Sequence, residues 1–262
     1  MIRIVNEGIS IQGNEIVLNT ELDSSTDILN YVNPEIYKAD FGGNIYYFGY
    51  VFNDNASRKD RTIIIKWLKG IGKEIIDNNS LRKFIRKPLI KLNKEENLST
   101  FNAVLYPRSN RSNLTKAIVN EIGKLTQHET IKNSFELIKT LPQNIEFDWE
   151  LFNMDYEGEL WNNQYNQIYD YVENTLMPKI HNLTYFSIAD SVKPKYRQYI
   201  KDYLIFPNEE SKNAIRAIQN GKLLIVDDIN TSGSTLTEIL RIVHAINNDC
   251  EVYIFTLIGK DN

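Results

Sequence analysis

The sequence predicts an α/β fold in which a central, mostly parallel β-sheet is flanked by helices. Three stretches carry this prediction: strand, loop and helix units at 101–125 and 223–246, and a final apolar run at 252–258. The apolar run that opens the second unit is too short for a buried helix and is typical of a strand covered on both faces. We expect an amino-terminal cap at 1–100 and a core at 101–262, with a large insertion at about 142–195.

The amino-terminal cap is predicted to contain both strands and helices. Short apolar runs around a Gly-Asn pair at 13–14 indicate a β-meander. The helices carry many basic residues, Lys66, Lys69 and Lys73 among them, but the whole chain has a net charge of −4. This balance favours a solvated helix face over a nucleic-acid surface. The expected elements are strands at 2–5, 9–11, 15–18 and 44–52 and helices at 61–76 and 80–92.

The first strand, loop and helix unit places a basic loop at the start of a helix. A strand is expected at 101–107 and a helix at 114–125. The polar loop between them contains Arg108, Ser109, Asn110 and Arg111. Guanidinium groups match phosphate oxygens in bidentate fashion, and a helix amino terminus attracts anions. By itself the loop also fits a solvated basic turn, but together with the second unit it favours an anion site.

The segment between the two units is too long for a plain connection. A strand is expected at 135–141 and a helix at 164–180, with an acidic and aromatic stretch between them. Connections of more than about 15 residues are uncommon in compact domains unless they have a function or structure of their own.

The second unit combines two acids with a loop of hydroxyl residues. A short helix at 208–218 leads into the strand, Asp227 and Asp228 follow at its carboxyl end, and the next helix is expected at 236–246. The loop before this helix consists of Thr231, Ser232, Gly233, Ser234 and Thr235. Such a loop offers hydroxyl and backbone donors to a phosphate. Carboxylates suit the vicinal hydroxyls of a sugar instead, directly or through a divalent cation. A capped helix with two surface aspartates is the alternative, but the joint pattern favours a ribose 5-phosphate site.

The stretch 223–235 resembles the phosphoribosyl-pyrophosphate signature of the type I phosphoribosyltransferases: a hydrophobic strand, an acidic pair and a Thr/Ser/Gly loop. The resemblance implies that Asp227 and Asp228 hold the ribose 2- and 3-hydroxyls and that the loop 231–235 binds the 5-phosphate. It also gives the loop 108–111 the place of the short pyrophosphate-binding loop of the family.

Members of this family carry a mobile loop that closes over the reacting sugar, and here the insertion falls at the same topological position. Closure would exclude water from a ribosyl cation. Three basic residues near the return of the insertion are therefore candidate partners for pyrophosphate: Lys193, Lys195 and Arg197. A solvated turn around Pro194 is an equal alternative.

The resemblance implies an enzyme that displaces pyrophosphate from C1 of phosphoribosyl pyrophosphate with a nitrogen nucleophile. Mg²⁺ is the implied cofactor, held by Asp227 and Asp228 together with the diphosphate, while Arg108 and Arg111 neutralise the leaving group. Members that act on 6-oxopurines have an acid where this chain has Thr231, so a 6-oxopurine acceptor is less expected.

The part that selects the nucleobase is expected before residue 101 and in the insertion. Four aromatic residues of the strand at 44–52 are candidates either for stacking on a base or for the core: Tyr46, Tyr47, Tyr50 and Phe52.

Two other functions remain open. A regulatory protein of the same fold would sense phosphoribosyl pyrophosphate without turnover. It would keep the motif at 223–235 but could lose the loop at 108–111, and the presence of both favours an enzyme. A diphosphokinase of the phosphoribosyl-pyrophosphate synthetase type is built from two such domains in tandem, whereas this chain shows one copy of the motif.

Composition sets the remaining expectations. With 262 residues, 42% of them hydrophobic, the chain can bury one large core or a medium core with a small cap. The single cysteine, Cys250, permits no internal disulfide, and the three histidines show no metal-ligand spacing. The sequence shows no signal peptide and no transmembrane stretch, so we expect a cytoplasmic protein without membrane contact. Small-molecule substrates are the expected partners, and a homodimer is compatible with the sequence.

Overall fold

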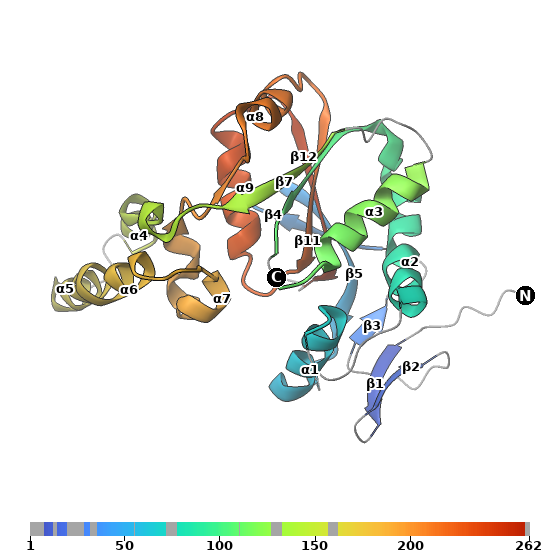
Figure 1. Cartoon of the computed structure of the whole chain (residues 1–262), viewed down its shortest axis with the longest axis horizontal. Helices are drawn as coiled ribbons and strands as arrows, with labels where there is room; N and C mark the ends of the chain where they lie inside the picture. Colours follow the sequence, from blue (N-terminus) through green and yellow to red (C-terminus); the bar gives the residue numbers. More distant parts are fainter. Residues whose placement is uncertain are drawn as a thin grey trace, which may run out of the picture.

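The computed structural model of the protein describes residues 8–12, 15–19, 29–31, 36–54, 56–71, 78–109, 111–126, 133–156 and 162–259. The predicted strand at 2–5, the turn at 13–14 and Asn110 lie outside these ranges. The described residues form a mixed α/β fold around a ten-stranded sheet with helices on both faces (Figure 1). This confirms the predicted α/β class with a central sheet of mostly parallel strands flanked by helices.

The sheet has a parallel centre and antiparallel margins. Its strands are β1 (Gly8–Gln12), β2 (Glu15–Asn19), β3 (Leu29–Tyr31), β4 (Tyr37–Phe41), β5 (Asn44–Phe52), β6 (Phe101–Pro107), β7 (Ser134–Lys139), β10 (Leu204–Ile205), β11 (Lys222–Ile229) and β12 (Glu251–Gly259). The centre runs in the order β7, β6, β11, β12, β5, and each neighbouring pair in it is parallel. β10 adds antiparallel to β7, β4 and β3 both add antiparallel to β5, and β1 and β2 extend the sheet beyond β3.

Strand β5 lies in a different place from the one expected for it. The sequence places it in the cap, but it pairs in parallel with β12 and so belongs to the central sheet. The physical reason is its continuous aromatic run, because Tyr46, Tyr47 and Tyr50 are between 0% and 3% exposed on a strand covered on both faces. The hydroxyl of Tyr50 donates to the carbonyl oxygen of Phe84 over 2.9 Å, and the two rings stack with centroids 4.0 Å apart. These rings form core, which is one of the two roles considered for them.

Helices cover both faces of the sheet. Leu224 and Val226 of β11 pack with α1 (Arg58–Leu68), α2 (Asn78–Glu96) and α3 (Leu114–Thr126), whereas Leu223 and Ile225 pack with α8 (Glu209–Arg216) and α9 (Ser234–His244). This alternation follows from the two-residue period of a strand. No helix of the described ranges combines the length and the apolar character needed to cross a membrane.

The buried aromatic side chains of the predicted insertion belong to the core that covers one face of the central sheet. The insertion and its flanks contain the short helix η2 (Pro142–Asn144), α4 (Trp149–Asp155), α5 (Asn162–Tyr171), the π-helical segment η3 (Val172–Leu176), α6 (Met177–His181), α7 (Ile188–Ser191) and the 3₁₀ helix η4 (Pro194–Tyr199). Strands β8 (Glu146–Phe147) and β9 (Ile200–Lys201) pair antiparallel at its base. Phe152 and Tyr199 are each 1% exposed, with ring centroids 5.1 Å apart. In Figure 1 helices α4, α5 and α6 project to one side of the sheet.

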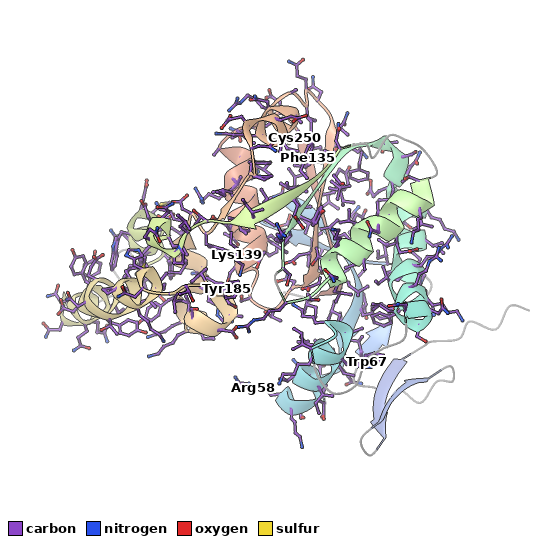
Figure 2. All side chains as sticks on the ribbon, in the orientation of Figure 1. Arg58, Trp67, Phe135, Lys139, Tyr185 and Cys250 are labelled. Carbon is purple, nitrogen blue, oxygen red and sulfur yellow. The ribbon has the colours of Figure 1, made fainter. Side chains whose placement is uncertain are left out.

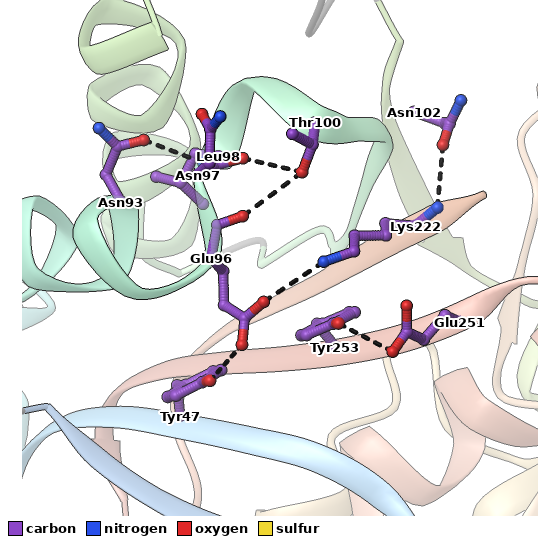
Figure 3. A network of polar contacts seen from close by, with 10 residues as sticks. All are labelled: Tyr47, Asn93, Glu96, Asn97, Leu98, Thr100, Asn102, Lys222, Glu251 and Tyr253. Carbon is purple, nitrogen blue, oxygen red and sulfur yellow. Dashed lines mark hydrogen bonds and ion pairs between the residues drawn. The ribbon is translucent and has the colours of Figure 1, made fainter.

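A polar network joins the end of α2 to the amino ends of the central strands (Figure 3). The carboxylate of Glu96 accepts a hydrogen bond from the hydroxyl of Tyr47 and pairs with Lys222, whose Nζ lies 3.4 Å away. The same ammonium lies 4.7 Å from the ring centroid of Tyr253. The short helix η1 (Leu98–Thr100) then leads from α2 into β6. These contacts fix α2 against the sheet at the edge opposite to the carboxyl ends of the strands.

Candidate functional site

A cavity of about 390 Å³ opens at the carboxyl ends of the parallel strands. Strand β6 ends at Pro107, β7 ends at Lys139, and β11 carries Asp227 and Asp228 next to its last residue. All four of these residues line the cavity. Ligands of open α/β sheets bind at this edge, where the strand ends and the following loops meet. The cavity therefore lies where the sequence predicts a site.

The acidic pair lies in the floor of this cavity and is almost completely buried. Asp227 is 8% exposed and Asp228 is 5% exposed. The backbone N–H of Asp228 donates to Oδ1 of Asp227 over 2.8 Å. Burial, and after it the neighbouring carboxylate of Asp228, raise the pKa of Asp227 to about 7. Two adjacent carboxyl groups in such a place need a cation or hydrogen-bond donors, because burial of an uncompensated charge is costly.

Lys69 supplies a cation to this pair. Its Nζ lies 2.9 Å from Oδ2 of Asp228, and its side chain is 26% exposed. Burial by itself would lower the pKa of Lys69, but the carboxylates of Asp228 and Asp227 raise it above its ordinary value. In the sequence this lysine is one of several on a basic helix face, and its spacing carries no signal for a role in the site.

The loop that follows β11 contains a glycine in a backbone conformation that other residues rarely adopt. Gly233 adopts a left-handed conformation with φ of +73°, and a Cβ at this position would lie 2.9 Å from Cζ of Phe41. Thr231, Ser232 and Thr235 line the main cavity. Gly233 and Ser234 line a smaller hollow of about 20 Å³ along the same loop. Because helix α9 begins at Ser234, the first N–H groups of this helix lack intrahelical partners and face this region.

The basic loop after β6 forms another wall of the cavity. Arg108, Ser109 and Arg111 all line it, while Asn110 lies outside the described residues. Nε of Arg108 lies 3.8 Å from Oε2 of Glu136. The guanidinium of Arg111 donates to Asp190 of the insertion over 3.0 Å. The two motifs, distant in the sequence, thus share one cavity.

A second cavity of about 350 Å³ adjoins the basic loop. Arg108, Ser109 and Thr115 line both cavities, and Lys116 and Glu136 line only the second. The loop therefore separates two hollows and presents its polar groups to both.

The three basic residues near the return of the insertion are arranged differently from one another. Arg197 lines the main cavity, but its guanidinium donates to the carbonyl oxygens of Val192 and Ala189 over 2.9 and 2.7 Å. Nζ of Lys193 lies 4.9 Å from the ring centroid of Tyr171, and Nζ of Lys195 lies 4.7 Å from that of Tyr196. Neither lysine lines the main cavity. A role of these lysines toward pyrophosphate stays a prediction.

Lys139 and Tyr185 also line the cavity and were not among the predicted site residues. Nζ of Lys139 donates to the carbonyl oxygen of Phe186 over 2.6 Å and lies 4.6 Å from the ring centroid of Tyr185, which Figure 2 shows beside it. The guanidinium of Arg111 lies 5.6 Å from the same ring. The position of Lys139 at the carboxyl end of a parallel strand is a signal that could have identified it. Tyr185 belongs to the insertion and has no comparable sequence signal.

The charges of the cavity favour an anionic ligand. Among its described lining residues, five are basic and three are acidic, although the whole chain has a net charge of −4. The basic residues are Lys69, Arg108, Arg111, Lys139 and Arg197, and the acidic residues are Asp190, Asp227 and Asp228.

The acidic pair also fits a magnesium ion that arrives with a phosphorylated ligand. Mg²⁺ is commonly held by one or two carboxylates together with phosphate oxygens of a substrate. Asp227 and Asp228 provide two such carboxylates. In the described ranges no group of three or more His, Cys, Asp or Glu side chains could hold a metal ion by itself. Asp227 and Asp228 are the residues of the cavity that would hold such an ion.

Comparisons with known proteins add little to this geometry. No family model matches the sequence, and no curated protein matches it. A solved structure of a hypoxanthine phosphoribosyltransferase from Staphylococcus aureus is similar at 11% sequence identity, with a TM-score of 0.33. The likeness covers 69% of this chain and 66% of that enzyme, which is just under two thirds of its length. A likeness this weak carries no argument for fold or activity.

Proposed function

We propose that the cavity binds 5-phosphoribosyl 1-pyrophosphate and that the protein transfers the phosphoribosyl group to a nitrogen acceptor. One observation carries this proposal. The acidic pair, three hydroxyl residues of the loop 231–235 and the two arginines of the loop 108–111 line one cavity. A ligand with a diol between two phosphate groups needs this combination of acceptors flanked by two sets of donors.

Each part of the ligand has a chemical counterpart in this proposal. The loop 231–235 binds the 5-phosphate through backbone N–H groups and hydroxyls. Asp227 and Asp228 accept hydrogen bonds from the ribose hydroxyls. Arg108 and Arg111 lie on the side of the diphosphate and neutralise the charge that it gains when it leaves. The Arg111 side chain is 62% exposed, so it can turn from Asp190 to a ligand at little cost.

The proposed reaction exchanges two bonds at C1 of the ribose. The bond between C1 and the diphosphate oxygen breaks, and its electron pair leaves with the pyrophosphate. The nitrogen of the acceptor forms the new bond to C1 with its lone pair and then loses its proton. A transition state that resembles a sugar cation needs fixed positions and compensated charge more than covalent help. Mg²⁺ bound with the diphosphate would add positive charge to the leaving group.

The acceptor subsite is proposed to lie between the cap and the insertion. Ile65 and Ile71 of the cap and Tyr185 and Ile188 of the insertion give the cavity an apolar part. A planar nitrogenous base would pack against such a wall, since aromatic and apolar side chains stack well on base faces. Thr231 leaves the loop without the acid that 6-oxopurine enzymes use, so another base or amine is the proposed acceptor.

The experiment that tests this function has two steps. Calorimetry first measures the binding of phosphoribosyl pyrophosphate with Mg²⁺ to the full chain, and we expect saturable binding at one site. Release of pyrophosphate is then measured with a panel of pyrimidines, purines and simple amines. Release with at least one acceptor supports the transferase. Tight binding without release for any acceptor would instead support a sensor, and absence of binding would contradict the sugar-phosphate site itself.

A further inference from the structure

Lys69 is held in the site by the way its helix ends. The two residues before it, Trp67 and Leu68, are 9% and 2% exposed and belong to the core that covers one face of the sheet. The backbone N–H of Lys69 donates to the carbonyl oxygen of Ile65 and that of Gly70 donates to the carbonyl oxygen of Trp67, both over 3.0 Å, and Gly70 has φ of +65°. The backbone of Lys69 is therefore fixed at the end of α1, and its side chain extends from there to the acidic pair.

The ion pair of Lys69 and Asp228 offers a diol both a hydrogen-bond donor and a hydrogen-bond acceptor. An ammonium group has three donors, and the ion pair with Asp228 engages at least one of them over 2.9 Å. A carboxylate has several lone pairs, so Asp228 can accept from a hydroxyl while it remains paired. One sugar hydroxyl can therefore donate to the carboxylate while the ammonium donates to the oxygen of its neighbour. Both side chains line the cavity, so a ligand there can reach them.

We infer that Lys69 is a substrate-binding residue of the cap that completes the ribose clamp and makes the binding of ribose 5-phosphate independent of a metal ion. The inference rests on the proposed function, because it assigns a ligand-binding role to a residue of the same cavity. The metal is then required only when a ligand also carries a diphosphate. The burial of Asp228 supports this role, since a 5% exposed carboxylate needs a cation before any metal arrives.

The test is calorimetry of ribose 5-phosphate binding to the full chain in EDTA and in excess Mg²⁺. The wild type is expected to bind with similar affinity in both. Lys69→Met should weaken binding in EDTA by at least about tenfold, the scale of a lost charge-assisted contact, and should regain affinity in Mg²⁺. Lys69→Arg keeps a cation beside Asp228 and should bind ribose 5-phosphate in EDTA more tightly than Lys69→Met does. The matched control is Lys66→Met, which removes an exposed lysine from the same helix.

The possible results separate this inference from the proposed function. Equal affinity of Lys69→Met and the wild type in EDTA would overturn the role of Lys69, as would a wild type that binds only in Mg²⁺. In both cases the sugar-phosphate site would still stand. No binding by the wild type in either buffer would contradict the proposed function and this inference with it. Recovery of the Lys69→Met protein in Mg²⁺ would also show that the variant is folded.

Discussion

The hydroxyl of Tyr203 donates a hydrogen bond to the backbone carbonyl oxygen of Ser234 over 2.8 Å. Tyr203 is 3% exposed and lies where the insertion returns to the sheet, while Ser234 begins helix α9 after the hydroxyl loop. Beside it, Arg241 of α9 donates to Asp202 over 2.6 Å. These two contacts tie the return of the insertion to the proposed phosphate loop.

Tyr203→Phe should therefore weaken the binding of ribose 5-phosphate, because the hydroxyl holds the backbone at the first residue of α9. The loss of one hydrogen bond is worth about 1 kcal/mol, which corresponds to roughly fivefold in affinity. We expect calorimetry to show a loss of about three- to tenfold in the affinity for ribose 5-phosphate. Tyr169→Phe is the control, because Tyr169 is 45% exposed on α5. Equal affinity in the two variants would contradict the positioning role of Tyr203.

Asp228→Asn should reduce the affinity for ribose 5-phosphate by at least about tenfold, because it removes a charged acceptor from the diol clamp. The amide also leaves Lys69 without its anionic partner. Asp249→Asn is a control with the same change of charge at an exposed position of the loop before β12. Titration of both variants with the sugar phosphate measures the difference. Unchanged affinity of Asp228→Asn would contradict the proposal that Asp228 binds the hydroxyls of the sugar.

Gly233→Ala and Gly123→Ala should have effects of opposite sign on stability. Gly233 has φ of +73° and lies against the ring of Phe41, so alanine is expected to cost about 1–2 kcal/mol there. Gly123 lies inside α3, where an added Cβ would meet nothing within 4 Å, so alanine is expected to add about 0.5–1 kcal/mol. Urea unfolding followed by circular dichroism measures both. A stable Gly233→Ala protein with normal phosphate binding would contradict the proposed loop geometry.

The raised pKa of Asp227 predicts a pH dependence of stability. In the unfolded chain this carboxyl loses its proton near its ordinary pKa, whereas in the folded protein burial and Asp228 keep the proton until about pH 7. Between these values the folded state binds more protons, so the contribution of Asp227 to the free energy of unfolding falls as pH rises. Above about pH 7 it is constant.

The difference in stability between the wild type and Asp227→Asn isolates this contribution, because other groups titrate in both proteins. Unfolding free energies at pH values from about 4.5 to 7.5 should show the wild type losing stability relative to the variant with rising pH. A difference that is flat across this range, or that rises with pH, would show that the pKa of Asp227 is not raised.

Glu96→Ala should destabilise the fold without involving the cavity. The hydroxyl of Tyr47 donates to Glu96, and burial, with Glu96 after it, raises the pKa of that hydroxyl. Removal of the carboxylate leaves the hydroxyl of buried Tyr47 and the ammonium of Lys222 without this partner, which is expected to cost about 1–3 kcal/mol in unfolding experiments. Glu95→Ala, at the exposed neighbouring position, should stay within about 0.5 kcal/mol of the wild type. Similar losses in both variants would show that the network contributes little.

The central strands could be predicted because their signal is local. Apolar runs such as 101–107 and 252–258 are too short for buried helices, and strands covered on both faces require them. The place of β5 could not be predicted in the same way, since its pairing with β12 depends on a partner about 200 residues further along the chain, and the register is set by the whole sheet. The helix expected at 164–180 contains the π-helical segment η3, which no periodicity indicated.

The sequence by itself determined that Asp227 and Asp228 lie near the carboxyl end of a buried strand and precede a loop of glycine and hydroxyl residues, because these signals act within a few neighbours. It did not determine which cations face these acids. Lys69 and Lys193 are both lysines on polar positions, yet only Lys69 of the two lines the cavity. Which of the two lysines lines the cavity depends on the order of the strands and on how α1 and the insertion pack at the carboxyl ends of the strands. Only the tertiary structure decides this.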